Sequence, residues 1–197
     1  LHDWLRVIVR YALGLAMVTY GVFKLFHLQM LPPHLAKLVQ PYGDSSSTSL
    51  LWIFMGSSAA YSAFTGVVEM LGGVLLFNRR TTTLGALISL GALAQVVTLN
   101  LSYDMSVKLW SMNLLALAFV LVMPDLRRLV YVLVLNRPSE PVAFSPLFQR
   151  EKYNRLAFRI GMVCLAITFA YRVVGLANGR GQAYSRTPVA IYGIYEG

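Results

Sequence analysis

Two ionisable side chains, Glu69 and Lys24, stand next to long apolar runs and are the first candidates for chemistry. The run 64–77 around Glu69 contains no other charged residue. A charged group at the centre of a membrane-spanning helix costs at least about 2.5 kcal/mol, so Glu69 is expected to be paired or protonated. Two roles are open for Glu69: a proton-linked or ligand-binding carboxylate, or an ion pair that only aligns two helices.

Lys24 is the expected partner of Glu69. At 1.5 Å per helical residue, Glu69 lies about 12 Å inward from Phe77, and Lys24 lies about 21 Å inward from Arg10 on the same side. A lysine side chain that bends inward covers much of this difference, so the sequence predicts a Lys24–Glu69 ion pair. For Lys24 itself, a purely structural role in the pair is the favoured interpretation.

A second group of polar residues gathers near one mouth of the predicted bundle. Asn100, Asp104 and Lys108 follow each other at intervals of four, so they share a face if one helix continues through them. The favoured alternative is a turn near Asp104 that brings Lys108 back toward it. Ser111 and Asn113 extend this polarity into the next span and are predicted to line a pocket.

The composition predicts an all-α integral membrane protein. Hydrophobic residues make up 57% of the 197 residues and charged residues 13%, against about 25% charged in soluble domains. The net charge of +9 comes from basic residues in short loops between apolar runs, so no nucleic-acid partner is expected. The chain begins at Leu1 rather than at a methionine, which suggests a piece of a longer protein.

Apolar runs predict a four-helix transmembrane bundle and a fifth transmembrane helix, with four spans plus an interfacial helix as the alternative. One run is about 42 Å long as a helix, so it must tilt or its first turns must stand clear of the lipid. Small residues and Gln95 are expected where helices pack. The predicted spans are 5–28, 50–77, 83–101, 107–123 and 156–177, and the segment 129–135 is expected to lie along the membrane surface.

These spans divide the chain into four parts, with a predicted orientation. The parts are a bundle at 1–129, an interfacial helix with a basic linker at 130–155, the fifth helix at 156–177 and an extracytoplasmic tail at 178–197. Eleven Lys and Arg residues fall on the side of the amino terminus and six on the other. The positive-inside rule therefore predicts a cytoplasmic amino terminus and an extracytoplasmic carboxyl terminus.

Metal and thiol chemistry have little support in the sequence. The single cysteine, Cys164, lies in an apolar run and cannot form a CxxC pair. His27 and His34 are too few for a zinc site without a cysteine cluster. No nucleotide-binding loop or hydrolase motif occurs, so we expect no metal and no soluble-type catalytic centre.

Several motifs together resemble the DoxX-like family of bacterial membrane proteins. They are the segment Val68-Glu69-Met70-Leu71-Gly72-Gly73-Val74-Leu75-Leu76, a first helix with Gly21 and Lys24, and Tyr103-Asp104-x-x-Val107-Lys108-Leu109. The likeness covers about 5–129. It implies a four-helix bundle in the bacterial cytoplasmic membrane, with some family members associated with quinone-linked or thiol-linked oxidoreductases, and the positions that match are Gly21, Lys24, Glu69, Gly72 and Gly73.

Three functions follow as hypotheses, and the sequence leaves open whether the chain is an enzyme. The first is a membrane subunit of an oxidoreductase system that binds a quinone near Lys24, Glu69, Asp104 and Lys108, beside an apolar slot that opens to lipid. The second is a non-catalytic accessory subunit that docks a partner protein or a second copy. The third is a small-molecule or proton-coupled transporter, for which inverted repeats are not evident.

Overall fold

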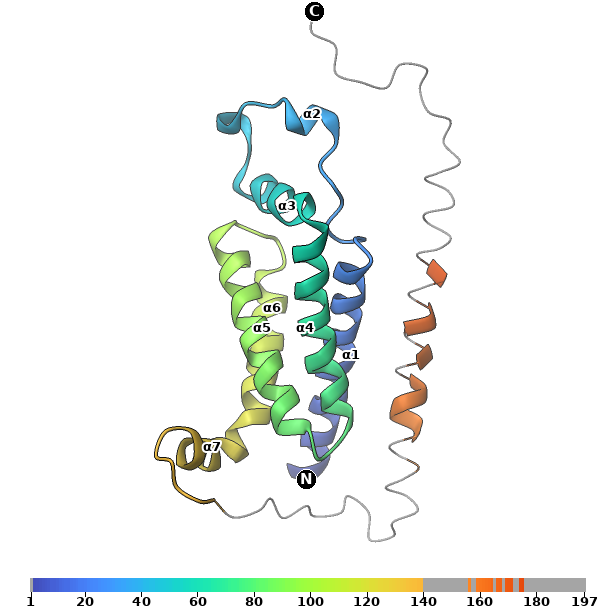
Figure 1. Cartoon of the computed structure of the whole chain (residues 1–197). Coiled ribbons are helices and arrows are strands. Elements are labelled where there is room, and N and C mark those ends of the chain that lie inside the picture. The colour runs from blue at the N-terminus through green and yellow to red at the C-terminus, as the bar shows by residue number, and fades with distance from the viewer. Residues whose placement is uncertain are drawn as a thin grey trace, which may run out of the picture.

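All regular structure in the described part of the chain is helical (Figure 1). The computed structural model describes residues 2–139 and, beyond them, 156, 159–164, 166–167, 169–171 and 174–175. The elements in chain order are α1 (His2–Leu25), α2 (Leu35–Leu38), η1 (Tyr42–Asp44), α3 (Ser47–Ser57), α4 (Ala59–Phe77), α5 (Thr82–Ser102), α6 (Lys108–Val122), η2 (Met123–Asp125) and α7 (Leu126–Leu133).

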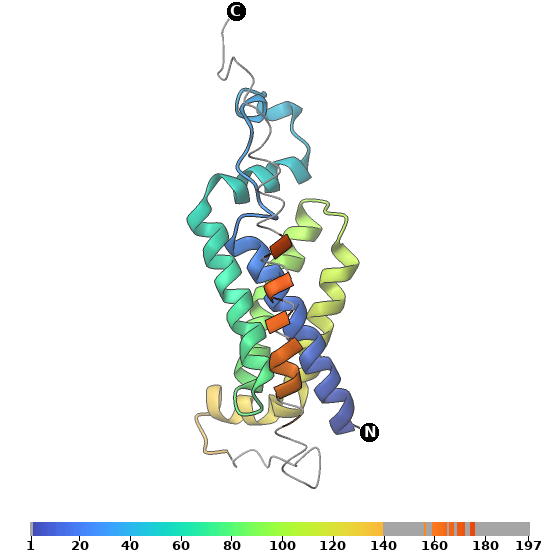
Figure 2. The ribbon, with the colours of Figure 1, turned by 90° about the vertical axis from the view of Figure 1, so that its right-hand side faces the viewer.

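Helices α1, α4, α5 and α6 run side by side as a bundle (Figures 1 and 2). Helices α1, α4 and α5 each carry a stretch long and apolar enough to cross a membrane, and a fourth such stretch, Lys108–Leu133, begins with α6 and continues into α7. Around the bundle, α1 packs on α4, α4 on α5, α5 on α6, and α6 on α1. Leu13, Met17, Leu76 and Leu121 are fully buried at its centre. The predicted four-helix architecture is confirmed, while insertion into a membrane is taken up below as a proposal.

Glycines bring the backbones of α1 and α4 into close contact. A Cβ atom on Gly21 would lie 2.6 Å from the carbonyl oxygen of Gly66, and one on Gly73 would lie 2.8 Å from that of Gly14. Both distances are shorter than real Cβ contacts, so only glycine permits this approach. Gly72 faces α5 instead, where its Cβ would lie 2.7 Å from the Ser89 hydroxyl. The predicted packing role of these small residues is confirmed.

The prediction of one continuous helix over 50–77 is wrong. The helix is interrupted at Ser58, whose φ of −120° and ψ of 100° are extended. Helix α3 ends before this residue and helix α4 begins after it. The Ser58 hydroxyl accepts from the Tyr61 amide at 3.3 Å and so caps the start of α4. This cap lets α3 turn across the end of the bundle, which removes the excess length (Figure 1).

The segments after α6 are only partly described. Helix α7 (Leu126–Leu133) lies at the amino-terminal end of the bundle, and Figure 2 shows it running across the direction of the long helices. Its range overlaps the segment 129–135 that was predicted to lie along the membrane surface. The described residues of the predicted fifth helix are helical, and a Cβ on Gly161 would lie 2.1 Å from the Tyr11 ring of α1. Cys164 in this segment is exposed. Residues 140–155 and the predicted tail 178–197 lie outside the described residues.

Candidate functional site

The predicted ion pair between Lys24 and Glu69 is confirmed. The Lys24 Nζ atom donates to Glu69 Oε1 at 2.5 Å, and the two side chains are 9% and 5% exposed. Lys24 lies in the last turn of α1, where the helix dipole stabilises a positive charge. Glu69 lies near the middle of α4. The pair is thus buried between α1 and α4.

Close backbone contact places this pair. Gly21 and Gly66 lie three residues before Lys24 and Glu69, which is nearly one turn on each helix. A Cβ on Gly66 would lie 2.7 Å from the Leu25 amide and 3.0 Å from the Lys24 Cβ atom. Because the two helix backbones are in contact at these glycines, the Lys24 side chain reaches Glu69 within the interface between α1 and α4.

A cavity of about 110 Å³ borders the ion pair inside the bundle. Five polar side chains contribute to its wall: Lys24, Gln29, Glu69, Asn100 and Ser111. The other lining side chains are apolar or aromatic, namely Met17, Tyr20, Met30, Leu51, Met55, Leu93, Val96, Leu99, Met105, Val107, Trp110 and Leu114. An apolar cavity with a few convergent polar groups is the usual form of a small-molecule site.

Two acceptor atoms at this cavity have no hydrogen-bond partner among the described residues. They are Glu69 Oε2 and Gln29 Oε1, and both are buried. Buried polar atoms are almost always satisfied in folded proteins, so such atoms indicate a bound molecule or water. Lys24 has two further N–H bonds beyond the one directed at Glu69. The site can therefore accept hydrogen bonds from a hydroxyl group and donate them to a carbonyl group.

A cap rich in methionine closes one end of the cavity. Met30, Leu51, Met55 and Met105 form a buried cluster, to which α3 contributes Leu51 and Met55 as it crosses this end of the bundle (Figure 1). The Thr48 hydroxyl donates to the Tyr103 carbonyl oxygen at 3.1 Å and ties α3 to the turn between α5 and α6. Methionine side chains adapt to different shapes, so this cap can repack around a ligand.

A second cavity, of about 410 Å³, lies between α4 and α5 and also borders Lys24 and Glu69. Its wall includes Phe64, which is 64% exposed, and Gly91. A Cβ atom on Gly91 would meet nothing within 4 Å, so this glycine leaves open space at the surface of α5. The ion pair thus stands between the internal cavity and a slot that opens at the side of the bundle.

The turn between α5 and α6 has the folded-back geometry that was the favoured prediction. Lys108 forms an ion pair with Asp104, whose φ of 52° is left-handed. The hydrogen bond from Lys108, aided by its charge, lowers the pKa of the exposed Asp104 carboxyl. Asn100 instead points inward, where its Nδ2 atom donates to the Ser111 hydroxyl at 2.9 Å.

The predicted binding residues therefore divide into two groups. Asn100 and Ser111 line the internal cavity with Lys24 and Glu69, whereas Asp104 and Lys108 lie outside its wall. Asn113 is exposed and does not line this cavity with Ser111. Residues two positions apart point to different sides of a helix, which explains the difference.

The remaining polar residues have mainly structural contacts. Gln95 of α5 donates to the Tyr61 hydroxyl of α4 at 3.1 Å, which confirms its role between helices. His27, with a φ of 54°, donates from Nε2 to the Ala59 carbonyl oxygen at 2.9 Å. In the described part of the chain, no three His, Cys, Asp or Glu side chains cluster as metal ligands would.

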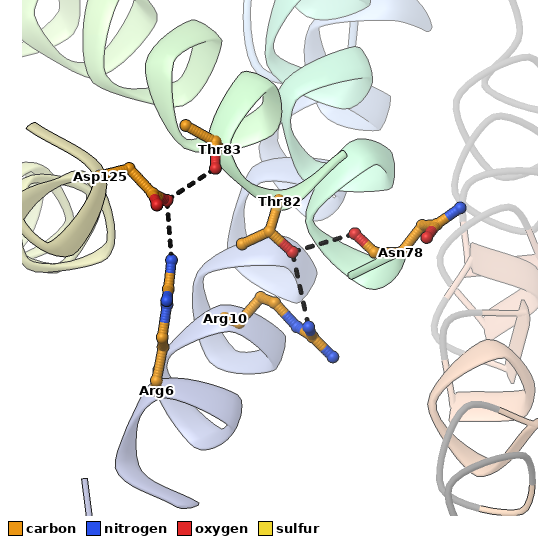
Figure 3. A network of polar contacts seen from close by, with 6 residues as sticks. All are labelled: Arg6, Arg10, Asn78, Thr82, Thr83 and Asp125. Atoms are coloured by element: carbon orange, nitrogen blue, oxygen red, sulfur yellow. Dashed lines mark hydrogen bonds and ion pairs between the residues drawn. The ribbon is translucent and has the colours of Figure 1, made fainter. Parts of the chain in front are cut away.

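A polar network at the opposite end of the bundle was not predicted (Figure 3). Arg6 of α1 donates to Asp125 at 2.9 Å, and the Thr83 hydroxyl donates to the same carboxylate oxygen at 2.7 Å. The buried Arg10 lies 3.5 Å from the Thr82 hydroxyl. The position of Asp125 directly after an apolar span was the available signal, but nothing in the sequence indicates that it lies beside Arg6.

Comparisons with known proteins leave the family open. The chain is similar to the uncharacterized protein YwoB of Bacillus subtilis strain 168, with 34% identity over 80 residues. The matched part is 41% of this chain and 52% of that protein, so the chain spans about half the length of the curated relative it matches. No protein-family model and no solved structure matches the chain. The resemblance to the DoxX-like family stays a prediction.

Proposed function

We propose that the chain is a membrane-embedded subunit of an oxidoreductase system and that its bundle binds a quinone. The observation that carries the proposal is the buried Lys24–Glu69 pair at the wall of an apolar cavity, where Glu69 Oε2 has no hydrogen-bond partner among the described residues. A quinone has an apolar ring with polar oxygens at its edge. The lining of this cavity has the same combination of apolar surface and a few hydrogen-bonding groups.

Insertion into the bacterial cytoplasmic membrane is part of this proposal. Four helices have the length and apolar composition that a bilayer requires. Large apolar side chains also point away from the bundle, among them Ile8 at 62% exposure, Phe64 at 64% and Leu109 at 77%. Water would be a poor solvent for such a surface, whereas lipid tails would cover it. The excess of basic residues at the end that holds the amino terminus supports a cytoplasmic amino terminus.

The two members of the ion pair suit the two redox forms of a quinone. Lys24 can donate a hydrogen bond to the carbonyl oxygen of the oxidised form, and Glu69 Oε2 can accept one from the hydroxyl group of the quinol. Reduction of a quinone to a quinol takes up two electrons and two protons. Glu69 is placed to relay the two protons one after the other, and the two electrons come from a partner redox protein, because one cysteine cannot form a redox pair.

The slot between α4 and α5 gives the quinone a path from the lipid. It borders both members of the ion pair, and Gly91 keeps it unfilled. The variant Gly91→Phe is expected to block this path and slow quinone exchange. Ala94→Phe, at an exposed position of α5 outside both cavities, is the matched control. Equal exchange rates in the two variants would exclude the slot as the path.

A non-catalytic accessory subunit is the second candidate. The ion pair lies within one turn of the Gly21–Gly66 contact, and a pair in this position would also serve to lock α1 against α4. In that case the unpaired oxygen of Glu69 would hold only water. The chain would then contribute an assembly surface to a larger complex rather than a quinone site.

The deciding experiment is gentle purification with native lipids and neighbouring proteins, followed by mass spectrometry of what copurifies. We expect a stoichiometric quinone with the wild type and its loss from Glu69→Gln. Asp104→Asn, which removes a carboxylate outside the cavity, is the control and is expected to keep the quinone. A defined assembly with no redox molecule in the wild type would contradict the proposal and favour the accessory subunit.

A further inference from the structure

We propose a second binding site, for the phosphate group of an anionic phospholipid, in the angle between α5 and α7. The proposal rests on membrane insertion but not on the identity of the ligand beside Lys24 and Glu69. The site lies at the end of the bundle that holds the amino terminus, away from the methionine-rich cap (Figure 1). It is a cavity of about 520 Å³.

The wall of this cavity combines a basic part with an apolar part. Arg79, Arg80 and Arg128 are the basic members. The apolar members come from α5 and α7 and are Leu84, Leu87, Leu129, Val132 and Leu133. Guanidinium groups bind phosphate oxygens through two parallel hydrogen bonds, and apolar side chains provide a surface for acyl chains. A phospholipid offers both chemistries in one molecule.

The one acidic side chain in this wall does not neutralise the arginines. Asp125 is 6% exposed, and its carboxylate receives Arg6 at 2.9 Å and Thr83 at 2.7 Å (Figure 3). Arg80 and Arg128 are exposed, and within the described residues neither forms an ion pair. The cavity therefore keeps an excess of positive charge that an anionic group would complement.

Helix α7 places basic side chains at the membrane depth of lipid phosphates and apolar side chains at the depth of the acyl chains. It lies at the amino-terminal end of the bundle and runs across the direction of the long helices (Figure 2). Leu126, Leu129, Val130 and Leu133 share one side of this helix, and Arg127 and Arg128 lie off that side. A short helix of this kind lies in the headgroup region with its apolar side toward the acyl chains. The arginines then stand at phosphate depth, with Leu84 and Leu87 deeper along α5.

The test is native mass spectrometry of the whole chain in a neutral detergent. Phosphatidylglycerol and phosphatidylcholine with the same acyl chains are added in equal amounts, and a parallel sample receives inorganic phosphate alone. We expect phosphatidylglycerol to be retained in preference. The variant Arg80→Gln/Arg128→Gln should weaken this retention about fivefold for each arginine removed. Arg127→Gln/Arg137→Gln removes the same charge from the same end but outside this cavity, and should change retention little.

A thermal measurement on the wild type gives a readout that requires no variant. Phosphatidylglycerol should raise Tm more than phosphatidylcholine does, since a ligand that binds the folded state stabilises it. Equal retention of the two lipids, or equal losses in the two double variants, would overturn the site. Displacement of the lipid by millimolar inorganic phosphate would assign the cavity to a free anion and would also overturn it. A chain that is soluble without detergent would instead contradict membrane insertion.

Discussion

Removing the charge of Glu69 should destabilise the bundle far more than removing that of an exposed carboxylate. The substitution Glu69→Gln keeps the side-chain volume and one oxygen acceptor, but it leaves the Lys24 ammonium buried with its side chain 9% exposed. Breaking a buried ion pair by removing one partner costs about 3–5 kcal/mol. For a chain of 197 residues, at about 2–4 °C per kcal/mol, Tm should fall by roughly 6–20 °C.

Thermal unfolding in detergent, followed by intrinsic tryptophan fluorescence, measures this change. The chain has three tryptophans, and Trp110 lines the cavity beside the pair. The double variant Lys24→Met/Glu69→Leu replaces both charges with apolar side chains of similar size. Such replacements are neutral or stabilising by about 1–4 kcal/mol, so its Tm should return at least to the wild-type value. Asp104→Asn, at the exposed pair, should leave Tm nearly unchanged.

The double variant also separates stability from binding. If the pair only locks α1 against α4, the double variant should restore every property of the wild type. If the pair binds a quinone, the double variant should be stable and yet carry none. A Tm for Glu69→Gln equal to that of the wild type would refute the reasoning, because no buried lysine charge would then have lost its partner.

Three further predictions concern packing and the two ends of the bundle, and each is checked by Tm. Gly66→Ala should lower the free energy of unfolding by about 1–3 kcal/mol, since its Cβ would lie 2.6 Å from a carbonyl oxygen of α1. Gly91→Ala, with open space around it, should leave this free energy unchanged or raise it by up to about 1 kcal/mol. Asp125→Asn should cost about 1.5–3 kcal/mol, because it weakens the charged hydrogen bond from α1. Lys108 lowers the pKa of Asp104, so their pair stabilises the fold above the unfolded pKa of about 3.9, and this contribution is lost as the pH falls through the folded value.

The outcomes that would contradict these predictions are equally specific. Equal Tm values for the two glycine variants would mean that α1 and α4 are not in close contact. A wild-type Tm for Asp125→Asn would show that its carboxylate is solvated rather than bound to α1. For the exposed pair, the small Tm difference between Asp104→Asn and the wild type should shrink on acidification. A difference that grew would contradict the prediction that this pair stabilises the fold only while Asp104 is ionised.

The ion pair and the four long helices could be predicted because membrane depth restricts the options. A carboxylate inside an apolar run needs a partner, and helix geometry left Lys24 as the candidate at a suitable depth. The turn near Asp104 was predictable for a similar reason, since a connection of only five residues between two spans forces an antiparallel return. In each case one strong local constraint decided the outcome.

The features that were missed depend on contacts between distant parts of the chain. The break at Ser58 lies in a long apolar run without proline, and two adjacent serines do not by themselves distinguish a helix cap from a helix interior. The bond between Arg6 and Asp125 joins residues 119 positions apart. Asn113 is only two residues from Ser111, but helical periodicity turns it away from the cavity that Ser111 lines.

The central claim, a quinone site beside Lys24 and Glu69, is tested most directly by titration with a short-chain quinone. Trp110 fluorescence is followed in a chain whose other tryptophans, Trp4 and Trp52, are replaced by phenylalanine. Saturable quenching in the reference chain, and its loss in the stable Lys24→Met/Glu69→Leu variant, is the result we predict. Quenching that rises without saturation and is identical in both chains would show that the quinone only dissolves in the detergent, and would contradict the site.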